Sequence, residues 1–89
     1  MSMNTNASEE TRIAVVAIIV EDQEFAAAVN DILHQYSSHI IGRMGLPYEK
    51  KGVNIISVIM DAPADAISAL SGKLGKQQGV SSKVLYSKA

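Results

Sequence analysis

Two stretches of the chain are apolar at almost every position. Residues 13–20 read IAVVAIIV and residues 53–60 read VNIISVIM, and both are rich in β-branched side chains. A strand exposed on one face alternates apolar and polar residues, whereas a strand buried on both faces is apolar throughout. Each stretch therefore predicts a β-strand with apolar side chains on both faces.

After each of these strands, apolar residues recur at the intervals of an α-helix. The first helix has one continuous apolar stripe made of Phe25, Val29, Ile32, Leu33 and Tyr36. Asp22 is a favourable N-cap for this helix, and the sequence SSH at residues 37–39 ends it. After the second apolar stretch, Pro63 fits the first turn of another helix, where its missing N–H costs nothing. The stripe of that second helix is Ile67, Leu70 and Leu74.

Two weaker strands complete the pattern. Residues 40–46 have a glycine on either side of Arg43 and Met44, which indicates a bent strand. The charged residues 47–52 are typical of a mobile hairpin loop. Residues 80–86 predict a last strand, in which one side is formed by Val80, Ser82, Val84 and Tyr86.

The elements follow in the order β-α-β-β-α-β. Two split βαβ halves with right-handed crossovers give a four-stranded antiparallel sheet with both helices on one face, which is the ferredoxin-like α+β sandwich. In this arrangement the first and third strands are central and the other two are edges. The sequence agrees, because the uniformly apolar strands are the first and the third.

The helices cover only one face of such a sheet, so some apolar side chains need another cover. In the first strand the choice is between two alternating sets, Ala14, Val16, Ile18 and Val20 or Ile13, Val15, Ala17 and Ile19. In the third strand it is between Asn54, Ile56, Val58 and Met60 or Val53, Ile55, Ser57 and Ile59. Large exposed apolar patches mark interaction sites. We therefore expect a homo-oligomer, a dimer or a tetramer, that packs this face against a partner.

Length and composition narrow the class of protein. The chain has 89 residues, and we expect a disordered polar tail over residues 1–10 and one domain over 11–89. Because the net charge is −1, no strong attraction to nucleic acid or to an acidic membrane is expected. The apolar run at 13–20 is too short to span a bilayer and lacks the flanks of a signal peptide. Cysteine is absent, and we expect a cytoplasmic protein.

Three glycines stand at the end of the second helix. Gly72 within the helix suggests either a close approach of backbones or a small ligand lying against bare backbone. Gly75 suits a left-handed residue after the helix end, and Gly79 suits a tight turn into the last strand.

These glycines also belong to a family resemblance. VEDQE after the first strand, N-x-[IL]-L-H in the first helix, R-x-G-x-P in the second strand and ALSGKLG followed by GV resemble the iron-only hydrogenase system regulators over residues 12–86. That family is similar in fold to ACT-like domains, especially the C-terminal domain of nickel-responsive repressors. The resemblance implies a small oligomeric sensory or regulatory domain, with a hydrogenase-maturation protein as a possible partner.

By analogy with ACT-like folds, a small effector is expected at a subunit interface near the loop after the first strand and the glycine-rich end of the second helix. The candidate residues are Val20, Glu21, Asp22, Gly72, Gly75 and Gly79. The alternative is a protein-binding adaptor whose open sheet or edge strands bind another protein without any small ligand.

No catalytic constellation stands out in the sequence, and we expect neither an enzyme nor a bound cofactor. Glu21, Asp22 and Glu24 cluster where a helix begins, and negative charge is favourable there. His34 and His39 are the only histidines, and they are weak candidates for a metal because a helix break separates them.

Overall fold

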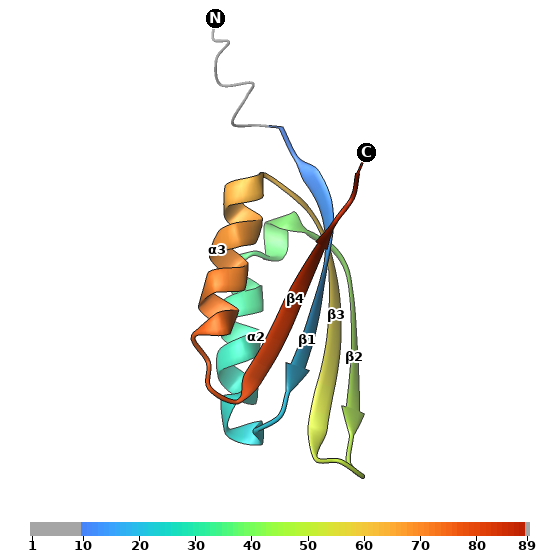
Figure 1. Ribbon diagram of the computed structural model, residues 1–89, viewed down its shortest axis with the longest axis vertical. Helices are drawn as coiled ribbons and strands as arrows, with labels where there is room; N and C mark the ends of the chain where they lie inside the picture. The colour runs from blue at the N-terminus through green and yellow to red at the C-terminus, as the bar shows by residue number, and fades with distance from the viewer. Residues whose placement is uncertain (1–9, 89) are drawn as a thin grey trace, which may run out of the picture.

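A four-stranded antiparallel sheet with two α-helices packed on it is formed by residues 10–88, the part of the chain that the computed structural model describes (Figure 1). The elements are β1 (Arg12–Val20), η1 (Gln23–Phe25), α2 (Ala26–Gln35), η2 (Ser37–His39), β2 (Ile40–Tyr48), β3 (Val53–Ala62), α3 (Ala64–Gly75) and β4 (Val80–Tyr86), where η marks a short 3-10 helix. Except for Glu10, the predicted tail lies outside the described residues.

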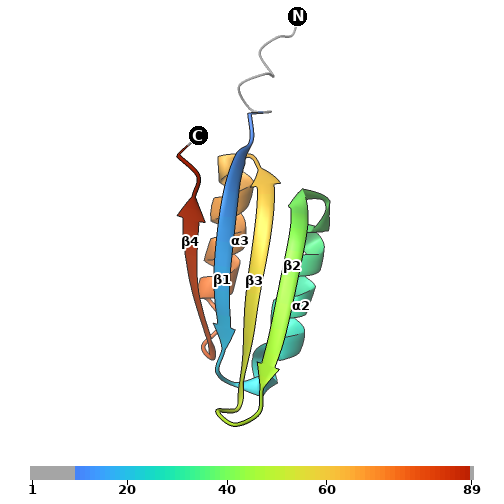
Figure 2. The same ribbon diagram turned by 90° about the vertical axis from the view of Figure 1, so that its right-hand side faces the viewer.

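The strand order is β2-β3-β1-β4, so the predicted ferredoxin-like βαββαβ topology is confirmed. β1 pairs with β3 over its whole length, from Arg12 opposite Ala62 to Val20 opposite Asn54. The two uniformly apolar strands are therefore the central ones, and the strands that carry more polar residues are the edges. Both helices lie on the same face of the sheet (Figures 1 and 2).

The structure decides which apolar set faces the helices. The fourteen buried residues of the core include Ala14, Val16, Ile18 and Val20 from β1 and Ile56, Val58, Met60 and Ala62 from β3. The helices contribute the other six, Val29, Ile32, Leu33, Ile67, Leu70 and Leu74, and all of them belong to the two predicted stripes. Phe25 and Tyr36 of the first stripe are partly buried and pack against this core. In β4 the predicted inner set is half-buried, and the residues between are exposed. The remaining apolar set of the central strands faces away from both helices.

Strand β2 is longer than predicted. It continues through Pro47 and Tyr48, which pair with Asn54 and Val53, so the predicted loop at 47–52 shrinks to a turn at 49–52. A proline fits here because β2 is an edge strand, and edge strands tolerate a missing N–H. Gly52 closes the turn with a φ of 66°, a conformation that favours glycine. The predicted bend is present as a register shift between Ile40 and Gly42, which is typical of a β-bulge.

The helix starts differ slightly from the prediction. The Asp22 side chain accepts a hydrogen bond from the Glu24 N–H at 3.0 Å, but the element it caps is the 3-10 helix η1, and α2 follows directly after it. Pro63 stands one residue before α3 rather than in its first turn, and its carbonyl oxygen accepts from the N–H groups of Ala66 and Ile67. No helix within residues 10–88 is long and apolar enough to cross a lipid bilayer.

The three glycines after residue 70 have different environments. Gly75 is the last residue of α3, and Gly52 is the one glycine of the described chain with a positive φ, so the prediction of a left-handed Gly75 was wrong. A Cβ at Gly72 would meet nothing within 4 Å, which excludes a close approach of α3 to the sheet at this point. Approach by another subunit at Gly72 stays a prediction. A Cβ at Gly79 would collide with the Cβ of Asp22 and lie 2.8 Å from Phe25 Cδ2.

This contrast gives a paired prediction for stability. The Gly79→Ala substitution should lower the free energy of unfolding by about 1–3 kcal/mol, because the methyl group overlaps Asp22 and Phe25. In the Gly72→Ala control the methyl group meets open space on a helix, so a gain of about 0.5–1 kcal/mol is expected. Urea denaturation of both variants checks the pair, and changes of the same sign would contradict it.

Candidate functional site

The loop after β1 and the turn before β4 form one tight junction. The Gly79 carbonyl oxygen accepts hydrogen bonds from the backbone N–H groups of Glu21 at 2.7 Å and of Asp22 at 3.3 Å. Val20, which is fully buried, pairs with Val80 at the end of the β1–β4 ladder. Four of the six residues expected to hold an effector are thus brought together, and their backbones are in direct contact.

The other two candidates lie apart from this junction. Gly72 and Gly75 are exposed on α3, and a Cβ at either position would have no heavy atom within 4 Å. The three cavities described for residues 10–88 are lined by other residues than these six. Binding of an effector at the six residues stays a prediction.

The two histidines occupy separate positions. His34 is exposed in the last turn of α2, and His39 is half-buried at the end of η2. Within residues 10–88 no group of three or more His, Cys, Asp or Glu side chains is placed to hold a metal ion.

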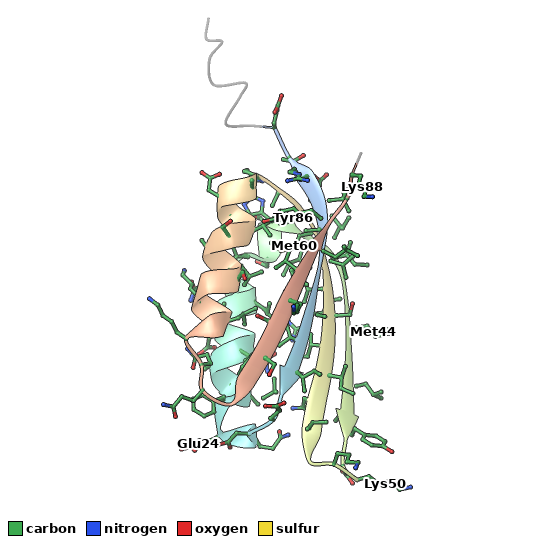
Figure 3. The ribbon with its side chains drawn as sticks, viewed as in Figure 1. Glu24, Met44, Lys50, Met60, Tyr86 and Lys88 are labelled. Atoms are coloured by element: carbon green, nitrogen blue, oxygen red, sulfur yellow. The ribbon has the colours of Figure 1, made fainter. Side chains whose placement is uncertain are left out.

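The face of the sheet turned away from the helices, visible in Figure 2 and here called the open sheet face, carries many exposed apolar side chains. Its large exposed side chains are Ile13 and Ile19 of β1, Met44, Leu46 and Tyr48 of β2, Ile55 and Ile59 of β3, and Leu85 of β4. Met44 and Leu85 are the most exposed of these, each at 71%. Figure 3 shows Met44 extending away from the helices. An exposed apolar surface shared by four strands is typical of an interaction site.

Charge on this face is balanced. By the alternation of β3 and β4, the open sheet face includes Asp61, paired with Ile13, and Lys83, paired with Ala17. Both side chains are exposed. A shallow cavity of about 210 Å³ lies beside Lys83, between Ala17 and Ile19 of β1 and the serines of β4.

A second surface lies on the helix side, along strand β2. Two neighbouring cavities of about 330 and 240 Å³ share the lining residues Pro47 and Asn54. The smaller cavity is called the α2–β2 groove, and the residues used to define it are Asn30, Arg43, Gly45, Pro47 and Asn54. The groove exists because Gly45, opposite Ile56, has no side chain, and a Cβ there would meet nothing within 4 Å.

Polar side chains converge along these two cavities. Arg43 Nη2 donates to Asn30 Oδ1 of α2 at 2.6 Å. Further along, Asn54 Nδ2 donates to Gln23 Oε1 at 3.1 Å, and Gln23 Nε2 donates to the Gly52 carbonyl oxygen at 3.3 Å. A guanidinium with neighbouring amides is suited to binding an anion, and the open sheet face is suited to binding another apolar surface.

Sequence reasoning missed the α2–β2 groove as a site. Arg43 and Asn54 are the only signals, because both stand at positions of their strands that face the helices, where apolar residues would otherwise be expected. Their proximity to Asn30 and Gln23 depends on the register of β2 against β3, which is not readable from either strand alone.

Comparison with known proteins identifies relatives of this chain. Residues 12–84 match the sequence profile of the family described as "TM1266-like: Iron-only hydrogenase system regulator, putative". A solved structure, the uncharacterized protein TM1266 from Thermotoga maritima, is similar at 40% identity with a TM-score of 0.84. This similarity covers 89% of the present chain and 100% of the Thermotoga chain. The comparison with curated proteins gives no match.

A more distant likeness supports the fold alone. A formyltetrahydrofolate deformylase from Pseudomonas putida KT2440 matches with a TM-score of 0.60 at 11% identity. The matched region covers 82% of this chain and 28% of the deformylase chain, so the shared part is one βαββαβ unit within a longer protein.

The two hydrogen bonds of the Gln23 side chain predict a local effect on stability. The Gln23→Ala substitution removes two hydrogen bonds that connect η1 to the β2–β3 hairpin. Because Gln23 is exposed, we expect the free energy of unfolding to fall by only about 0.5–1 kcal/mol. Backbone amides at 49–52 should exchange hydrogen faster than in the wild type. The matched control is Gln78→Ala, an exposed glutamine in the turn before β4, and equal exchange at 49–52 in both variants would contradict the prediction.

Proposed function

Because the chain belongs to the TM1266-like family of iron-only hydrogenase system regulators, we propose that it is a non-catalytic regulatory subunit that acts as a homodimer through its open sheet face. The observation that carries the proposal is the eight-residue apolar surface of that face. Covering a large aliphatic side chain contributes about 1.5–3 kcal/mol at full burial, so a partner on this face gains from each partly exposed isoleucine.

The area of the face is suited to a dimer. The 9 residues of β1 span about 30 Å, and four strands side by side span about 19 Å, so the flat area is about 570 Å² before the relief of side chains is added. Stable protein interfaces bury about 800 Å² on each partner. One open sheet face, with its protruding side chains, is therefore close to the size that a stable interface requires.

The charges of the face support a second copy of the chain as the occupant. Among the described strand residues of this face, Asp61 and Lys83 are the charged ones, and they carry opposite signs. Two identical faces therefore meet without a net charge repelling them. A strongly acidic or basic partner finds no complementary surface here.

Regulation follows if a ligand binds one arrangement of the subunits better than another, because the assembly can shift only by that difference in affinity. A hydrogenase-maturation protein is then the partner that binds preferentially to one arrangement of the subunits, through surfaces outside the dimer interface. The proposed action is binding, with no bond made or broken in the process.

The dimer is tested by placing a charge on a central strand of the face. Ile55 lies in the central strand β3 and is 40% exposed, so Ile55→Lys should leave the helix-side core unchanged. We expect the dimer dissociation constant to rise at least about 100-fold, because a lysine ammonium loses hydration inside an apolar interface. Ser68→Lys, on the exposed surface of α3, is the control and should remain a dimer.

Sedimentation velocity over a wide range of concentrations measures the outcome, with circular dichroism to verify the fold of each variant. A wild-type protein that sediments as a monomer at every concentration would overturn the homodimer. If that monomer instead binds a maturation protein, and Ile55→Lys abolishes the binding, the adaptor function is supported in its place.

A further inference from the structure

The Arg43 guanidinium in the α2–β2 groove has unused hydrogen-bonding capacity. An arginine has five N–H donors in a planar fork. The structure gives Arg43 one partner, Asn30 Oδ1, and within residues 10–88 no carboxylate forms an ion pair with it. The groove thus contains a cation whose charge no residue of the described chain neutralises.

The space beside Arg43 is open to a ligand. Gly45 is two residues further along β2 and faces the same side of the sheet, and a Cβ there would have no neighbour within 4 Å. A glycine inside a strand weakens it and often marks a close approach by a ligand or another backbone. If Arg43 served only to connect β2 to α2, a larger residue at position 45 would fill the groove and strengthen the strand.

The far end of the groove offers amide groups. Asn54 is half-buried on the helix side of β3, next to the buried Ile56. Its Nδ2 donates one hydrogen bond to Gln23, which leaves a second N–H and the Oδ1 atom for another partner. A ligand that lies along Gly45 therefore meets a cation at one end and an amide at the other.

Based on these contacts, we propose that the α2–β2 groove binds a small monocarboxylate, with its carboxylate on Arg43 and an amide or hydroxyl group at Asn54. A guanidinium fork pairs with a carboxylate through two parallel hydrogen bonds. The cavity of about 240 Å³ corresponds to about eight water molecules at ~30 Å³ each, which is the size of a short-chain acid. A nucleotide carries several negative charges, whereas the groove supplies one cation.

This binding site does not depend on the dimer. The groove lies on the helix side of β2, and the open sheet face lies on the other side of the same strand. A single chain contains the whole groove, so a failed dimer and a failed ligand site give separate results.

The test titrates ¹⁵N-labelled protein with two probes of equal size, glutaric acid monoamide and its uncharged counterpart glutaramide. We expect saturable shifts of the backbone amides of Gly45 and Asn54 with the monoamide, and none with glutaramide. The Arg43→Gln variant should raise the dissociation constant at least tenfold. The control Lys88→Gln removes one exposed positive charge beyond the end of β4, outside both surfaces, and should leave binding unchanged.

A second variant checks the position of the ligand. Gly45→Val places a side chain in the groove while Arg43 itself is retained, and it should abolish the shifts while circular dichroism stays that of the wild type. Three results would overturn the proposal: no saturable shifts in the wild type, equal binding of glutaramide, or an equal loss in Lys88→Gln and Arg43→Gln. Tighter binding of inorganic phosphate than of the monoamide would also overturn it, because the site would then select a different anion.

Discussion

Two helices can cover only one face of a four-stranded sheet, yet the central strands of this protein are apolar on both. Eight of the fourteen core residues are helix-side residues of β1 and β3, whereas Ile13, Ile19, Ile55 and Ile59 on the other face are each about two-fifths exposed. A chain of this size has a small core. Apolar residues that stay in water therefore leave part of its limited hydrophobic stabilisation unused. The excess of apolar strand surface is therefore the constraint from which the proposed assembly follows.

Much of the fold was predictable because hydrophobic periodicity acts locally. The apolar runs at 13–20 and 53–60 identified the central strands, and six residues of the two predicted helix stripes are in the core. Periodicity did not choose between the two faces of β1, because both are apolar. It also missed Pro47 and Tyr48 as strand residues, because their pairing with Asn54 and Val53 is set by the partner strand and not by their own propensity.

The glycines also show what the sequence alone does not reveal. A glycine can be required by a positive φ, by a close neighbour, or by neither, and the sequence does not distinguish these cases. The structure assigns the positive φ to Gly52 and the close neighbours to Gly79, and it leaves Gly72 in open space. The α2–β2 groove was hidden for a related reason. Its residues come from α2, β2 and β3, and only the register of the sheet brings Arg43 and Asn54 to one side.

Strand β2 connects the two surfaces physically. Its residues alternate, so Met44, Leu46 and Tyr48 lie on the open sheet face, whereas Arg43, Gly45 and Pro47 line the groove. As an edge strand with a register shift near Gly42, β2 pairs only with β3 and has no strand on its other side. The proposed ligand and the proposed dimer partner therefore contact opposite sides of the same strand. If either one changes the affinity for the other, the effect is reciprocal, because the coupling free energy is shared by both binding events.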